Sequence, residues 1–217
     1  MRSFRSSLLI PAAALLGAGV LACSGGNTPV APSSNSNSSS SSGSSHNSTG
    51  TVSIKLTDSP FSDAKALLVT FSEVSIHSAD TGEWQTLPFA AGSSRTCDLK
   101  KLQGPTDILG VGSLTAGKYT QIRLNVTSAA IYFENASQGE ACAAQIAAPA
   151  GSSASVDVPS GEVKLNNEFT VASGGGKTIL LDFDGDKSIH QAGSGNGKGN
   201  ASVKYMMVPV IRVVSVQ

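Results

Sequence analysis

The strongest constraint on the fold is an alternation of apolar and polar residues that recurs from residue 51 onwards. Its clearest example lies between 118 and 126, where Ile122, Leu124 and Val126 alternate with polar residues. Side chains of a strand point alternately to its two faces, so this pattern predicts a half-buried strand. About ten such short segments separated by turn residues, with one helical turn within 96–104, predict an all-β fold, an antiparallel β-sandwich.

Three irregularities are expected within this pattern. In 66–78 the apolar positions change parity, which predicts a bulge near Ser72–Glu73. The pair Asn166–Asn167 favours positive φ and predicts the turn of a hairpin. The segment 203–216 is apolar on both faces, which predicts a strand buried on both sides, with one unpaired edge at Pro209.

The first fifty residues lack the alternation. Residues 1–22 combine Arg2 and Arg5 with an apolar stretch and small residues, which is the organisation of a secretory signal peptide. Val20-Leu-Ala-Cys23 then resembles the bacterial lipobox, whose cysteine is acylated and becomes the first mature residue. The resemblance implies a lipoprotein signal peptide and palmitate-type acyl chains on Cys23, and Ser24 resembles the default signal for the outer membrane. An ordinary signal peptide that ends at a cysteine is the alternative.

Residues 23–50 consist almost entirely of Ser, Asn, Gly, Thr and Pro. Such a segment buries too little apolar surface to offset the entropy of ordering, so it is predicted to be a disordered, Ser-rich tether between lipidated Cys23 and a β-sandwich domain at 51–217. The formal net charge is zero and no basic patch is present, which argues against a nucleic-acid partner. The expected partners are the membrane, through the lipid anchor, and an unknown protein or glycan.

Two cysteines remain if Cys23 is lipidated. In an oxidising periplasm, a disulfide between Cys97 and Cys142 is the expected state. Closing that loop would stabilise the fold by about 4 kcal/mol. Free thiols and a metal site are the alternatives, and no histidine lies close in sequence to either cysteine, which argues against zinc.

The stretch 177–189 joins the apolar run 179–181 to the densest acidic cluster, Asp182, Asp184 and Asp186. At a spacing of two, side chains on an extended strand project from one face. These oxygen ligands would suit Ca²⁺, with Asp58 as a further ligand if the first strand lies alongside. The alternative is a solvated strand end neutralised by Lys187 and Lys204, with Asp58 in an Asx turn.

Catalysis is not expected from this chain. There is no Gly-x-Ser-x-Gly motif and no histidine in a context that suggests a triad. A sugar-stacking platform would draw on the aromatic residues Trp84, Tyr119, Tyr132 and Tyr205. Packing in the core or on the surface is the alternative for these four.

Several motifs occur in an order that resembles a known family. They are Leu56-Thr-Asp-Ser-Pro60, Val69–Ile76, Asp98-Leu-Lys-Lys-Leu102, Leu114–Leu124, Leu181-Asp-Phe-Asp184 with Ser188-Ile189, and Val208–Val214. Together they resemble the bacterial lipoprotein family catalogued as domain of unknown function 4382, over nearly all of 50–217. The turn Ala116-Gly-Lys-Tyr119 also resembles small prealbumin-type sandwiches, so an immunoglobulin-like or prealbumin-like sandwich is expected.

The family resemblance supplies no catalytic residues. We therefore expect a lipid-anchored cell-envelope binding or structural module, without catalytic activity or a required cofactor, at the outer membrane. A calcium-dependent surface adhesin or a carbohydrate-binding module is the alternative.

Overall fold

A computed structural model of the chain describes residues 48–59, 64–192 and 204–217. All of them belong to one compact unit, Ser45–Gln217. The signal peptide, Cys23 and nearly all of the predicted tether lie outside the described residues. The described elements are β1 (Thr49–Ser59), β2 (Ala66–Ser78), β3 (Trp84–Leu87), β4 (Arg95–Asp98), the 3₁₀ helix η1 (Leu99–Leu102), β5 (Asp107–Thr115), β6 (Gly117–Tyr132), β7 (Cys142–Ala143), β8 (Ser153–Asp157), β9 (Glu162–Val171), β10 (Gly176–Asp184), α1 (Gly185–Ser188), β11 (Ile189–Ala192), β12 (Lys204–Met207) and β13 (Ile211–Val216).

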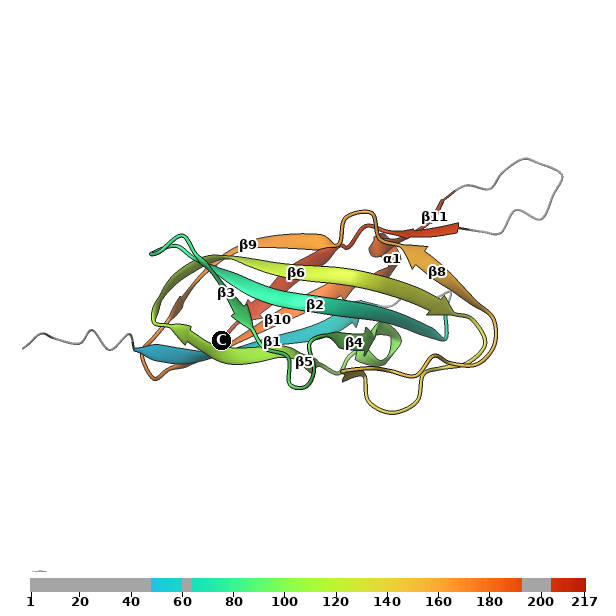
Figure 1. Ribbon diagram of the computed structural model, residues 1–217, viewed down its shortest axis with the longest axis horizontal. Helices are drawn as coiled ribbons and strands as arrows, with labels where there is room; N and C mark the ends of the chain where they lie inside the picture. Colours follow the sequence, from blue (N-terminus) through green and yellow to red (C-terminus); the bar gives the residue numbers. More distant parts are fainter. Residues whose placement is uncertain (1–47, 60–63, 193–203) are drawn as a thin grey trace, which may run out of the picture. The chain divides into compact units, whose positions relative to one another are not determined.

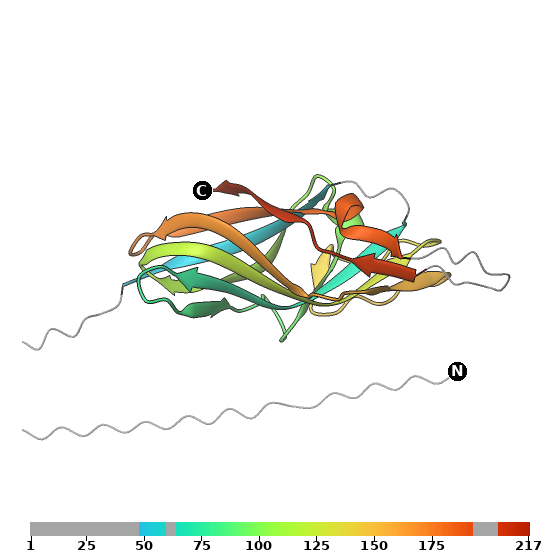
Figure 2. The ribbon, with the colours of Figure 1, turned by 90° about the horizontal axis from the view of Figure 1, so that it is seen from above.

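The strands form two sheets that pack face to face, which confirms the predicted β-sandwich (Figures 1 and 2). The four-stranded sheet has the order β13-β10-β1-β5. The nine-stranded sheet has the order β11-β12-β8-β6-β2-β4-β7, with β3 beside β2 and β9 beside β6. Most neighbouring strands are antiparallel, but β1 pairs with β10 and β12 with β8 in parallel, so both sheets are mixed.

One hydrophobic core fills the space between the sheets. The four-stranded sheet contributes alternate residues of β1 and β10, including Ile54, Leu56, Leu181 and Phe183, all fully buried. The strand pairing brings these rows together, since Ile54 lies opposite Ile179 and Leu56 opposite Leu181. Burying such side chains stabilises a fold by about 1.5–3 kcal/mol each, so the period-two pattern fixes which face of each strand is inside.

Several local predictions are confirmed. The pairing of β2 with β6 shifts register between Phe71 and Glu73, where the bulge was expected. The structure also has a β2–β3 hairpin, which turns at Gly82, where the φ of 74° suits glycine. The helical turn is η1, which begins at Asp98 because its side chain accepts a hydrogen bond from the Lys100 backbone N–H.

Two predictions are wrong. Asn166–Asn167 is not a hairpin turn, since β9 runs unbroken from Glu162 to Val171. The segment 203–216 is not one strand buried on both sides: within its described part, β12 and β13 belong to different sheets and separate around Pro209. The exposed side chains of Val208, Val210 and Val214 follow from this, because β13 is an edge strand of the smaller sheet.

Candidate functional site

The acidic stretch at the end of β10 is held by internal contacts. Asp182 is only 4% exposed, and its Oδ2 accepts from Arg212 Nη2 at 2.6 Å and Nε at 2.9 Å. The Ser59 hydroxyl lies 3.0 and 3.1 Å from the two Asp182 oxygens. Both Asp182 oxygens therefore already have protein partners.

Asp184 and Asp186 do not join Asp182 at a common point. Asp184 begins α1: its Oδ1 accepts from the Lys187 backbone N–H at 3.1 Å, and its Oδ2 pairs with Lys187 Nζ at 2.6 Å. This contact with Lys187 is the main reason that the pKa of Asp184 is lowered. Asp186 lies within α1 and is exposed, because the chain leaves the extended conformation after Asp184.

The prediction of an Asx turn at Asp58 is wrong. Asp58 lies in β1 opposite Phe183, on the same face as Leu56, so its carboxylate points into the core side of the sheet. It is 5% exposed, and neither oxygen makes a hydrogen bond of good geometry with the described residues, although the Gly185 backbone N–H and the Gln103 side-chain amide lie near enough to favour the ionised form. Burial raises the pKa of Asp58 to about 8, against the lowering effect of the Gly185 backbone N–H, and the Asp182 charge raises it further.

The four carboxylates thus do not form a metal site. Asp182 and Asp58 point to opposite faces of the smaller sheet, and Asp184 is occupied by its cap. In the described part of the chain, no group of three or more His, Cys, Asp or Glu side chains is arranged to hold a metal ion. The calcium interpretation therefore has no geometric support here.

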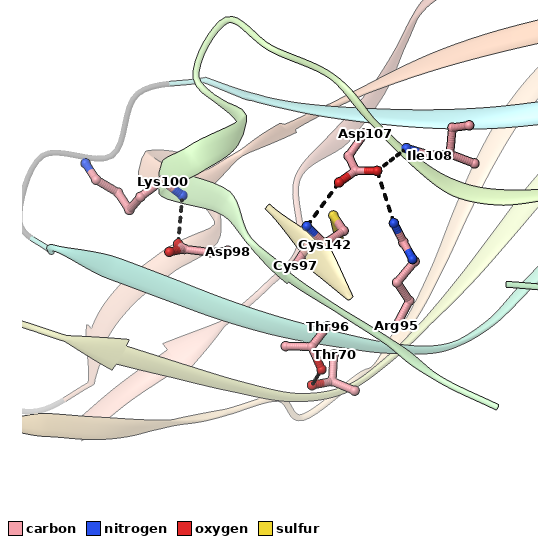
Figure 3. Close-up of a disulfide and its surroundings, with 9 residues drawn as sticks. All are labelled: Thr70, Arg95, Thr96, Cys97, Asp98, Lys100, Asp107, Ile108 and Cys142. Carbon is pink, nitrogen blue, oxygen red and sulfur yellow. Dashed lines mark hydrogen bonds and ion pairs between the residues drawn. A yellow bond between two sulfur atoms is a disulfide. The ribbon is translucent and has the colours of Figure 1, made fainter. Parts of the chain in front are cut away.

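The predicted disulfide is confirmed, and it belongs to a buried structural cluster (Figure 3). Cys97 and Cys142 link β4 to β7 and are both fully buried. Beside them, the Asp107 carboxylate accepts from Arg95 Nη2 at 3.0 Å and from the backbone N–H groups of Ile108 and Cys142 at 2.7 and 3.1 Å. These contacts tie β4, β5 and β7 together.

A different place on the molecule has the character of a binding site. It is a shallow hollow of about 480 Å³ on the outer face of the nine-stranded sheet, which we call the outer hollow. Its lining comes from β2, β3, β6 and β9: His77, Trp84, Thr120, Gln121, Asn166, Asn167 and Glu168. The strand pairing explains the gathering, because Trp84 lies opposite His77, His77 opposite Gln121, and Gln121 opposite Asn166.

Two β-bulges coincide at the outer hollow. Thr120 is an extra residue of β6 relative to β2, because His77 pairs with Gln121 while Ser78 pairs with Tyr119. Between the next two pairs, Tyr119 with Phe169 and Gln121 with Asn166, β9 has two residues where β6 has one. Consecutive residues therefore stay out of the core on both strands, namely Thr120–Gln121 and Asn166–Glu168. Bulges re-aim side chains and are frequent beside functional sites.

Hydrogen bonds hold most of the polar side chains of the outer hollow in place. His77 Nε2 lies 3.1 Å from the Gly82 carbonyl oxygen, which can only accept, so Nε2 carries the proton. In the neutral ring, Nδ1 then accepts from the Thr120 hydroxyl at 3.1 Å, which leaves the lone pairs of that hydroxyl available. Gln121 Nε2 donates to Asn166 Oδ1 at 2.6 Å.

Asn167 is the exception in this network. Its side chain lines the outer hollow, but its Oδ1 is buried and has no hydrogen-bond partner among the described residues. A buried acceptor without a partner costs about 1–3 kcal/mol. The amide is therefore not locked by a bond inside the protein.

Of the four aromatic residues singled out from the sequence, Trp84 alone lines the outer hollow. Its ring lies 5.1 Å from that of His77 between centroids, and the Arg123 guanidinium carbon is 3.8 Å from its centroid. Tyr119 is 1% exposed and donates to the Thr115 carbonyl, while Tyr205 packs against Phe133. Tyr132, at the other end of β6, lines a different hollow. The predicted platform of four aromatic rings is therefore not formed.

Sequence reasoning missed the polar half of this site. From the sequence, the Asn166–Asn167 pair predicts a turn, and Gln121 and Thr120 look like ordinary outward residues of a strand.

None of the helices in the described part of the chain has the length and apolar character needed to span a bilayer.

Comparison with known proteins identifies a family for this chain but does not indicate an activity. The family model described as "Domain of unknown function (DUF4382)" matches residues 49–204, which include every residue of the outer hollow. No curated protein and no solved structure matches the chain significantly.

Proposed function

Because the chain belongs to the DUF4382 family, whose description assigns no activity, we propose that it is a lipid-anchored binding module of the cell envelope without catalytic activity. Cys23 carries the lipid at the outer membrane, and the outer hollow holds the ligand. The lipobox-like Val20-Leu-Ala-Cys23 and the Ser-rich segment after it support the anchor. Several acyl chains on one cysteine would give firm attachment where a single chain is marginal.

The observation that carries the binding role is the coincidence of the two bulges at the outer hollow. Each bulge leaves a residue out of the strand pairing, so the regular ladder of backbone hydrogen bonds between the strands is interrupted there. In return, five polar side chains from two adjacent strands point to one place beside Trp84.

The chemistry of the outer hollow favours binding over catalysis. In a catalytic triad a carboxylate orients the histidine, but the Nε2–H of His77 donates to the Gly82 carbonyl oxygen instead, while its Nδ1 accepts from the Thr120 hydroxyl. Glu168 lines the hollow and is exposed, and among the described residues it makes no hydrogen bond or ion pair with His77. The rest of the lining consists of the Trp84 indole, the Thr120 hydroxyl and three neutral amides.

Anchoring is tested by growing expressing cells with labelled palmitate. We expect the label on the wild-type protein and its loss in Cys23→Ala, which moves from the membrane to the soluble envelope fraction. Cys97→Ala is the matched control, because it removes a cysteine of the disulfide and should keep the label. Equal labelling of wild type and Cys23→Ala would refute the anchor.

Binding is tested with the full-length protein purified in detergent and mixed with isolated envelope material. We expect the wild-type protein to co-sediment and Gln121→Ala/Asn167→Ala to co-sediment less. Ser128→Ala, an exposed position farther along β6, is the control and should behave as wild type. Equal behaviour of all three proteins would refute binding through the outer hollow.

A further inference from the structure

We infer that the ligand of the outer hollow is a neutral oligosaccharide or polysaccharide chain. The inference rests on the proposed function, since it names the ligand class of the same site. It follows from the charge, the hydrogen-bonding groups and the extent of the hollow.

The charges around the hollow cancel. Arg123 Nε lies 3.1 Å from Glu162 Oε2, and Lys164 Nζ lies 2.7 Å from Glu162 Oε1. Arg123 also has its guanidinium over the Trp84 ring. The lining itself adds the carboxylate of Glu168 and no Lys or Arg. The adjoining hollow adds Lys118, so the charges that the two linings contribute, those of Glu168 and Lys118, are opposite and cancel, and an anionic ligand such as a nucleic acid or an acidic glycan would meet a carboxylate as well as a single lysine.

The hydrogen-bonding groups suit hydroxyls. Thr120 and Gln121 offer acceptor oxygens, and the amides of Asn166 and Asn167 offer donors. A sugar hydroxyl both donates and accepts, so it can meet either kind of group. Asn167 Oδ1 faces inward, and rotation about χ2, a broad torsion, would turn it towards a ligand hydroxyl. Binding would then supply the partner that this oxygen lacks. The Arg123 guanidinium covers one face of the Trp84 ring, and the partly exposed remainder of the indole offers an apolar surface for the C–H groups of a sugar ring.

A protein partner fits less well. A stable protein–protein interface buries roughly 800 Å² on each side, with aromatic and apolar residues at its centre. Among the described residues, the exposed large hydrophobic side chains are Ile108, Val208, Val210 and Val214. All four belong to the strands of the smaller sheet or to the segment that leads into β13, and none lines the outer hollow.

The extent of the site indicates a chain of sugars. A second hollow of about 350 Å³ adjoins the first and shares Thr120 and Glu168 with it. It continues along β6 and β9 past Lys118 and Thr170. The two hollows together form an elongated groove, which favours a linear oligosaccharide over a single sugar.

Ligand binding can be followed by tryptophan fluorescence, because Trp84 is the only tryptophan of the chain and lines the outer hollow. The full-length protein in detergent is first applied to an array of neutral and anionic glycans. Neutral glycans that bind are then titrated while Trp84 fluorescence is followed. We expect saturable binding that changes little between 20 and 500 mM NaCl, since no charge pair is formed. Asn167→Ala should weaken it about fivefold, the effect of one ordinary hydrogen bond.

The controls separate this inference from the proposed function. The Asn167 side chain makes no bond within the protein, so Asn167→Ala should melt at the same or a higher temperature than wild type. Ser128→Ala should bind as wild type. Suppose that envelope co-sedimentation depends on the outer hollow, but that only anionic glycans, or no glycans at all, bind on the array. The proposed ligand class would then be refuted, while the proposed binding function would still stand. If neutral glycans bind equally to wild type and Gln121→Ala/Asn167→Ala, the site is refuted.

Discussion

Replacing Asp58 by Asn should remove a pH dependence of stability that the wild-type protein owes to one buried carboxyl. Asp58 is 5% exposed, makes no hydrogen bond of good geometry with the described residues and lies near the charge of Asp182. These conditions raise the pKa of Asp58 from 3.8 to about 8, with burial as the main cause and Lys100 among the groups that oppose it. The folded protein therefore holds a proton that the unfolded chain releases near pH 4.

The sign of the effect follows from that difference in proton binding. Between about pH 4 and pH 8 the folded state binds one more proton at this site, so raising the pH favours unfolding. The limiting slope is about 1.4 kcal/mol lost per pH unit. For a domain of this size, that corresponds to a fall in Tm of about 3 to 5 °C per unit. Asn is neutral and has the shape of the protonated acid, so Asp58→Asn should match wild type below about pH 4, and its advantage over wild type should grow by on the order of 3 kcal/mol between pH 5 and pH 8.

Thermal and urea unfolding of both proteins from pH 5 to pH 8 measures this directly. Asp184, Glu134 and Glu162 have lowered pKa values, so the stability that they contribute is lost only below about pH 4, outside the window. Other groups that titrate within the window are common to both proteins and cancel in the comparison. Asp186→Asn, at an exposed position in α1, should keep the wild-type slope. Parallel curves for wild type and Asp58→Asn would show that Asp58 is already ionised in the folded state.

Two further predictions concern stability. Cys97→Ala/Cys142→Ala opens a loop with a sequence separation of 45 and should lower the free energy of unfolding by about 4 kcal/mol in urea titrations, whereas an unchanged midpoint would mean that the disulfide does not form. Arg212→Ala leaves Asp182, whose side chain is 6% exposed, without its cation and should cost about 1–2 kcal/mol, allowing for the exposure of the arginine. Lys187→Ala, which removes the exposed partner of Asp184, should cost less than about 0.5 kcal/mol, and equal losses in the two variants would contradict this account.

The sandwich was predictable because its physical cause is local and repeated. In β1 and β6 the apolar residues alternate along the strand, and the same residues are buried in the structure. The bulge at Ser72–Glu73 was predictable for the same reason, since a change of parity within an apolar pattern has few other causes. The disulfide followed from the number of cysteines and the expected compartment.

The wrong predictions concern segments whose local sequence is compatible with two different structures. Asparagine favours positive φ and irregular backbone, which serve a turn or a bulge equally well, and only the pairing of β9 with β6 distinguishes them. The valines of 203–216 suit a buried strand, but the position of β13 at the edge of a sheet is decided by distant partners. Asp58 continues the inward row of Leu56, but the sequence Thr57-Asp-Ser-Pro60 favours a turn, and only the parallel pairing of β1 with β10 shows that the strand continues to Ser59.

The Asn167 side chain ties these observations to function. For folding alone, a residue with an unmet buried acceptor is a poor choice, since the missing hydrogen bond costs about 1–3 kcal/mol. Threonine would fit an outward position of a strand better and has a higher β propensity. Asn167→Thr should therefore unfold at the same or a higher temperature than wild type while losing glycan-induced changes in Trp84 fluorescence. A residue that lowers stability but strengthens ligand binding is expected at a binding site. If Asn167→Thr instead lost stability and kept glycan binding, Asn167 would have a structural role and not a binding role.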